Sequence, residues 1–109
     1  MATTPASRRD AVRAMVPKLI ELSEEVVYGD IWERPGLSKR DRSLIVIAAL
    51  IATYRPEQLQ GHLARALDNG VTKDEIAEVI THLAFYSGWP ASMTAARVAK
   101  EVMEERGLL

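Results

Sequence analysis

Apolar residues recur at helical spacing along most of the chain, and no stretch shows the strict alternation of apolar and polar residues that is typical of a strand. The first amphipathic pattern predicts an N-terminal helix over residues 6–28, which Pro17 interrupts. Because proline lacks the N–H that a helix interior needs, either a short first helix ends near Met15 or one longer helix kinks there. The segment from Tyr28 to Leu37 contains two glycines and a proline, and it predicts a structured loop.

The next helix is the most apolar part of the sequence. Ser38 is typical of a helix N-cap, and the helix it opens contains the nine-residue apolar run Leu44–Ala52. Such a run is also compatible with a buried strand, but the cap and three alanines favour a helix. A helix that is apolar all round must be covered on every side, and a helical chain of 109 residues has little material to do so. The pattern therefore predicts burial against another subunit.

Turn and cap signals divide the remainder into three helices. Gly70 is typical of the left-handed position that ends a helix, and Thr72 and Glu75 form a capping box for the helix that follows. The segment Ser87–Pro90 breaks that helix. The three predicted helices cover residues 56–68, 73–86 and 90–106. Together the patterns predict an all-α subunit of five or six helices, with its middle pairs roughly antiparallel.

Composition and charge exclude several function classes. The chain has 109 residues, enough for one domain, and its 14 Lys and Arg balance 15 Asp and Glu, so no concentrated basic face points to a nucleic acid. The longest apolar run is about half of what a membrane span needs, and no secretory signal is readable, so we expect a cytoplasmic protein. With no cysteine, the chain has no disulfide, thiolate nucleophile or cysteine metal site.

Two histidines and several arginines are the candidates for chemistry. By its sequence context alone, His62 fits either a proton donor or a structural histidine. His82 lies in an apolar helix, where a core or interface role is the simpler interpretation, and a pair with His62 is only a weak metal-site signal. Arg42 enters the apolar helix and needs a partner, such as Asp41 or another carboxylate.

Five segments in collinear order carry a resemblance to a known family: Gly29–Leu37, Arg42–Leu44, His62–Thr72, Asp74–Ile76 and Tyr86–Pro90. In them the sequence from Tyr28 onward resembles the carboxymuconolactone decarboxylase family, whose fold is shared with AhpD-like peroxidase components. The resemblance covers a family core over residues 29–109, after the N-terminal helix, and implies one domain over residues 1–109. It further implies a ring-like homo-oligomer, either a hexamer or otherwise a trimer.

The residues before the family histidine separate its branches. When His62 is placed on that histidine, Arg55 and Gln58 stand where the AhpD-like members carry their two redox cysteines. A disulfide reductase cannot work without sulfur. Decarboxylase-type members carry an Arg, a Glu and the His at this spacing, which Arg55, Glu57 and His62 match. The segment Thr81–Phe85 and the shorter N-terminal region depart from the decarboxylase pattern.

The resemblance implies cofactor-free, metal-free decarboxylation of 4-carboxymuconolactone, or a related small lactone or carboxylate, in aromatic catabolism. The lactone carbonyl and ring double bond can hold the electrons that remain after CO2 is lost, so the protein must bind carboxylates and protonate carbon. His62 is then the expected proton donor. Glu57 is its candidate partner, although an offset of about 140° around one helix does not assure contact.

Six further residues are candidates for substrate binding, and His82 is an additional candidate whose role stays open. The arginines have types that suit a carboxylate, and the aromatic residues lie at helix breaks, where they line a pocket or anchor a subunit interface. The six are Arg34, Arg42, Arg55, Trp32, Tyr86 and Trp89. Two alternatives to a lactone decarboxylase remain: a relative that keeps only a peroxiredoxin-like label, and a paralogue that acts as a small-molecule binding module or catalyses another reaction.

Overall fold

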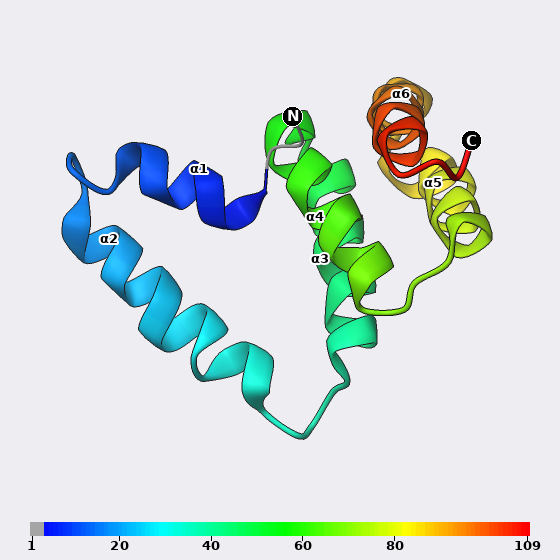
Figure 1. The fold of residues 1–109 in the computed structure, drawn as a ribbon. Coiled ribbons are helices and arrows are strands. Elements are labelled where there is room, and N and C mark those ends of the chain that lie inside the picture. Colours follow the sequence, from blue (N-terminus) through cyan, green and yellow to red (C-terminus); the bar gives the residue numbers. More distant parts are fainter. Residues whose placement is uncertain (1–3) are drawn as a thin grey trace.

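The computed structural model describes residues 4–109, and within them the secondary structure is helical throughout (Figure 1). The prediction of an all-α subunit with five or six helices is therefore confirmed. The α-helices are α1 (Pro5–Val12), α2 (Pro17–Leu22), α3 (Lys39–Ala52), α4 (Pro56–Asp68), α5 (Lys73–Ser87) and α6 (Trp89–Glu105). A π-helical segment, η1 (Ser23–Tyr28), continues α2, and a 3-10 turn, η2 (Ile31–Glu33), lies in the loop before α3. None of the described helices is long and apolar enough to cross a membrane.

Helices α3 to α6 build the core. Helix α3 packs against α4, α5 packs against α6, and α4 also packs against α6, so the two pairs lie side by side (Figure 1). Short connections join each pair, as expected for neighbouring antiparallel helices. The most deeply buried large side chains of this core are Ile47, Ile51, Leu59, Leu63, Ile76 and Val71.

Residues 4–28 form an N-terminal arm made of α1, α2 and η1. Figure 1 shows that the arm starts beside α4, runs away from it and returns through the loop that leads to α3. Helix α1 ends at Val12 and α2 begins at Pro17, so the short-first-helix alternative is confirmed. The residue before the proline, Val16, has non-helical backbone angles, φ −129° and ψ 61°, because proline disfavours a helical conformation there.

The arm leaves most of its apolar side chains exposed. Across α1, α2 and η1 only Ile20 is buried. Met15, which helical spacing suggests as core filler, is 83% exposed. The other exposed apolar residues of the arm are Val12, Leu19, Leu22, Val26 and Val27.

The caps that the sequence predicts are present. The Ser38 Oγ accepts a hydrogen bond from the Asp41 N–H at 3.0 Å, which opens α3. The Thr72 Oγ1 accepts from the Glu75 N–H at 3.1 Å while the Glu75 carboxylate accepts from the Thr72 N–H at 2.9 Å, so the capping box of α5 is complete. Gly70 has a φ of +97°, the left-handed conformation that ends a helix.

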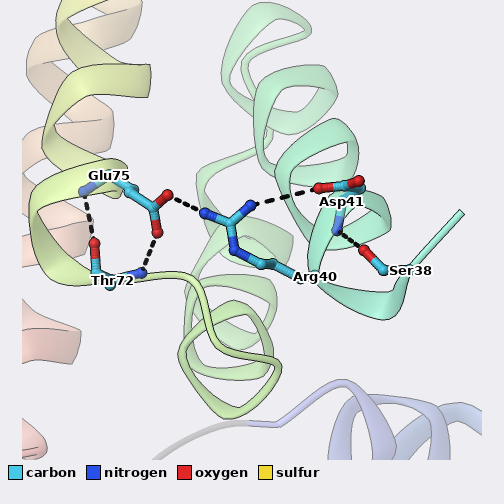
Figure 2. Close-up of polar contacts among 5 residues, drawn as sticks. All are labelled: Ser38, Arg40, Asp41, Thr72 and Glu75. Atoms are coloured by element: carbon cyan, nitrogen blue, oxygen red, sulfur yellow. Dashed lines mark hydrogen bonds and ion pairs between the residues drawn. The ribbon is translucent and has the colours of Figure 1, made fainter.

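Arg40 connects the first turns of α3 and α5 (Figure 2). Its guanidinium donates to the Glu75 carboxylate, which also caps α5, and to Asp41 Oδ1 at 3.4 Å. Asp41 therefore pairs with Arg40 and not, as one expectation had it, with Arg42. The Arg42 Nη2 donates instead to the backbone carbonyl of Arg34 at 3.1 Å.

We expect Arg40→Ala to lower the free energy of unfolding by about 1 kcal/mol, because one guanidinium joins two helix starts that are far apart in the sequence. The matched control is Arg97→Ala, which removes an exposed pair within α6 to Glu101 and should cost at most about 0.5 kcal/mol. Chemical denaturation of both variants measures the difference. Equal losses would contradict a connecting role for Arg40.

Helix α3 is not covered on every side within the described chain. Ile47 and Ile51 face the core and are fully buried, and Leu44 and Leu50 are partly buried. Ile45, by contrast, is 55% exposed. One face of this apolar helix thus lacks a partner within residues 4–109, which is the condition that the sequence pattern associates with a second subunit.

Candidate active site

His62 lies on α4 and faces the N-terminal arm. Leu59 and Leu63 of the same helix are buried in the core, while His62 lines a hollow with residues of α1, α2 and η1. Between α4 and the arm is a hollow of about 400 Å³, which suits a small molecule. Its polar lining comes from Arg8, Arg9, Ser23, Tyr28, Gln58 and His62, and its apolar lining from Pro5, Val12, Leu19, Ile20 and Val27.

The imidazole of His62 is uncharged at neutral pH. Burial, and after it the positive charges of Arg65 and Arg9, lower the pKa of His62 from 6.5 to about 4. Its Nδ1 is buried and has no hydrogen-bond partner among residues 4–109. The site therefore presents a neutral ring with an unused polar atom beside positive charge.

The ring of Tyr28 contacts two of the surrounding guanidinium groups. The Cζ of Arg9 lies 4.5 Å from the centre of the Tyr28 ring, and the Cζ of Arg65 lies 4.3 Å from it. Arg65 also lies 5.4 Å from the ring centre of Trp32, which stacks on Tyr28 at 5.9 Å. These cation–π contacts join the arm to α4 next to His62.

Sequence reasoning missed Arg9, Arg65 and Tyr28. Arg65 had a readable signal, because a residue three positions after His62 shares its helix face. Arg9 and Tyr28 had none, since only the packing of the arm brings them to α4.

Of the sequence-predicted substrate residues, Trp32 lies nearest to this arrangement. It is buried and lines a second hollow, of about 320 Å³, together with Tyr28 and Arg65. Four charged residues of that hollow are already paired across short distances: Lys39 with Glu33 at 2.7 Å, and Arg106 with Asp68 at 2.7 Å.

Glu57 lies outside the hollow of His62, in line with its offset around α4. Its side chain is 80% exposed and lies 3.8 Å from the guanidinium of Arg8. The structure thus provides no direct contact between Glu57 and His62 within one chain.

The three arginines predicted to bind carboxylate also lie outside this hollow. Arg34 is exposed and offers only its backbone carbonyl to Arg42. Arg55 is exposed just before α4, and its backbone N–H donates to the Leu50 carbonyl at 2.8 Å. A single chain therefore does not bring Arg34, Arg42 and Arg55 to His62.

Tyr86, Trp89 and His82 belong to an exposed cluster where α5 ends and α6 begins. We call it the aromatic patch, and it consists of His82, Phe85, Tyr86, Trp89 and Met93. The rings of His82 and Tyr86 lie 4.8 Å apart, and those of Phe85 and Trp89 lie 5.8 Å apart. Phe85 and Tyr86 are both 77% exposed. Since His82 is not among the residues that line the His62 hollow, the two histidines do not share it, and no three His, Asp or Glu side chains of residues 4–109 gather as a metal site.

The comparison with known proteins assigns the family. Residues 17–101 match the model of the carboxymuconolactone decarboxylase family. The chain belongs to the carboxymuconolactone decarboxylase family. Its matched segment begins at Pro17, so α1 with Arg8 and Arg9 lies before it.

Three relatives are similar to this chain, and two of them are named as decarboxylases. A 4-carboxymuconolactone decarboxylase of Acinetobacter baylyi is 46% identical over 81 residues, which cover 74% of this chain and 60% of the relative. The nitrosuccinic acid decarboxylase npaB of Metarhizium robertsii is 35% identical and covers 78% of this chain and 59% of the relative. An uncharacterized 15.0 kDa protein of Paracoccus denitrificans is 33% identical, and the match covers 95% of this chain and 81% of the relative. The chain thus spans about three fifths of the length of the two decarboxylases.

Proposed function

We propose that this family member is a carboxy-lyase that decarboxylates 4-carboxymuconolactone, or a related small lactone or carboxylate, without a cofactor. Two relatives bear the names of decarboxylases that act on small carboxylic acids. The observation that carries the proposal is the hollow in which His62 lies beside unpaired positive charge. We place this activity in the cytoplasm and in aromatic catabolism.

The reaction breaks the bond between the carboxylate carbon and the ring, and CO2 leaves. The electron pair of that bond passes into the ring double bond and the lactone carbonyl as a dienolate, and a proton must then reach carbon. His62 delivers this proton. Because its imidazole is neutral in the free protein, it acquires the proton when an anionic substrate offsets the charges of Arg65 and Arg9.

The active assembly in this proposal is a homo-oligomer, a hexamer or otherwise a trimer. The aromatic patch exposes three large rings, and each aromatic side chain can bury about 150–250 Å². Met93 adds to them, and exposed groups of large apolar side chains of this kind mark interaction surfaces. Ile45 and the exposed apolar residues of the arm add further apolar surface. Glu57 and the arginines outside the hollow are then available to the site of a neighbouring subunit.

The test is an assay of CO2 release by the purified protein with 4-carboxymuconolactone, and in parallel with nitrosuccinic acid. We expect turnover on one of them that a chelator does not diminish. Loss of turnover on chelation, restored by zinc, would contradict the cofactor-free mechanism. Absence of CO2 release from both compounds would remove these two substrates and favour the alternative, a small-molecule binding module that lacks redox cysteines.

A further inference from the structure

The hollow of His62 contains one cation without a counter-ion of its own. Arg9 projects from α1 into this hollow, and within the described part of the chain no acidic side chain forms an ion pair with it. Its Nε is buried and has no hydrogen-bond partner there. Glu24 feels the charge of Arg9, but both of its carboxylate oxygens already accept from Arg13, at 2.7 and 2.8 Å.

The other arginines of α1 are differently placed. Arg8 has Glu57 at 3.8 Å and Gln60 at 3.5 Å, and Arg13 binds Glu24 and Asp10. Only Arg9 of the three thus combines a lining position in the hollow with the lack of an acidic partner among residues 4–109. The ring of Tyr28, 4.5 Å from the Arg9 guanidinium, offers a cation–π contact but no carboxylate, so this partly buried charge still favours an anion that enters the hollow.

The rest of the hollow limits what this anion is. The walls that Val12, Leu19 and Val27 provide are apolar. The Nδ1 of His62 and the Nε of Arg8 are further buried polar atoms of lining residues that lack a partner among residues 4–109, and of these only the imidazole nitrogen can take up a proton. A carboxylate matches the planar guanidinium fork, and an apolar or ring-shaped body matches the walls.

We infer that Arg9, on the helix that precedes the family's matched segment, is the carboxylate-binding residue of the His62 site, and that a carboxylate bound there brings a proton onto His62. This inference rests on the proposed function, because it assigns to the same site the group that holds the substrate. It makes the N-terminal arm one wall of the site and not merely a connection to the bundle.

The proton follows from the charges around the imidazole. The charged or titratable groups that face His62 are Arg65 on its own helix, Arg8 and Arg9 on α1, and Tyr28 on η1, whereas α2 contributes only apolar side chains. Burial, together with the positive charges of Arg65 and Arg9, holds the pKa of His62 at about 4. A carboxylate on Arg9 cancels part of this charge, so the pKa rises and binding near pH 5–6 takes up a proton.

Succinate is a suitable probe because it is a small dicarboxylate that does not react, and uncharged succinamide is its control. Arg9→Gln should weaken succinate binding by about 10- to 100-fold, the loss expected for a hydrogen-bonded charged partner. Arg9→Lys keeps the charge but loses the paired N–H donors of the guanidinium. Its affinity for succinate should therefore lie between those of Arg9→Gln and the wild type. Lys18→Gln, which removes an exposed charge from the same arm, should bind succinate like the wild type.

The second readout is the pKa of His62 by NMR. The chain has two histidines, so His82→Gln assigns both imidazole signals. We expect succinate to raise the pKa of His62 in the wild type, and Arg9→Gln to raise it without ligand and to abolish the effect of succinate. Calorimetry in two buffers with different ionisation enthalpies should show proton uptake only where Arg9 is present.

Wild-type affinity in a folded Arg9→Gln variant, or a pKa of His62 that succinate does not move, would overturn this inference. If Arg9→Gln does not fold, Arg9→Lys tests the inference through the same two measurements, the affinity for succinate and the change in the pKa of His62 when succinate binds. A wild type that binds succinate through Arg9 but releases no CO2 leaves the inference intact and removes the proposed function. If the wild type is active and Arg9→Gln has an unchanged kcat/KM, the proposed function stands and the inference about Arg9 is removed.

Discussion

Replacing His62 with alanine is expected to lower turnover of 4-carboxymuconolactone by about 10²–10⁴-fold, the usual contribution of a positioned general acid or base. The ring faces the hollow between α4 and the arm, and the core side of α4 is occupied by Leu59 and Leu63. The substitution should therefore leave the fold and the assembly intact. Steady-state kinetics together with size-exclusion chromatography measures both.

The comparison variant is His82→Gln, which changes the other histidine of the chain in the exposed aromatic patch. Replacing an arginine that only binds the substrate carboxylate should raise KM more than it lowers kcat. This difference separates a loss of binding from a loss of proton transfer. Full activity of a correctly assembled His62→Ala protein would remove the mechanism, and His82 would become the better candidate for the acid.

The helices could be predicted because their ends are encoded locally. Ser38, Thr72 with Glu75, and Gly70 act through bonds and backbone angles within a few residues, so each is readable without tertiary structure. The break at Pro17 is local in the same sense. The π-helical form of η1 was not predictable, because the apolar pattern of residues 23–28 fits an α-helix equally well.

The site could be predicted only in part because its charges come from distant segments. His62 was found through its position in the family pattern, but Arg9 reaches it only because α1 packs beside α4. Sequence position also could not separate Trp32 from Tyr86 and Trp89. All three lie at helix breaks, yet Trp32 is buried beside Tyr28 while the other two are exposed on the aromatic patch.

That exposure leads to the prediction about assembly. We expect the wild type to form an oligomer with several times the 12.1 kDa mass of one chain, and Phe85→Glu to dissociate it, because a carboxylate buried in an apolar interface loses its hydration without gaining a partner. The association constant should fall by at least about 100-fold.

Arg97→Glu, which adds a carboxylate to an exposed position of α6 outside the patch, should assemble like the wild type. Light scattering at micromolar concentration measures all three proteins. A wild type that elutes as one species of 12.1 kDa would contradict the oligomer, and an assembled Phe85→Glu variant would move the interface to Ile45 and the N-terminal arm.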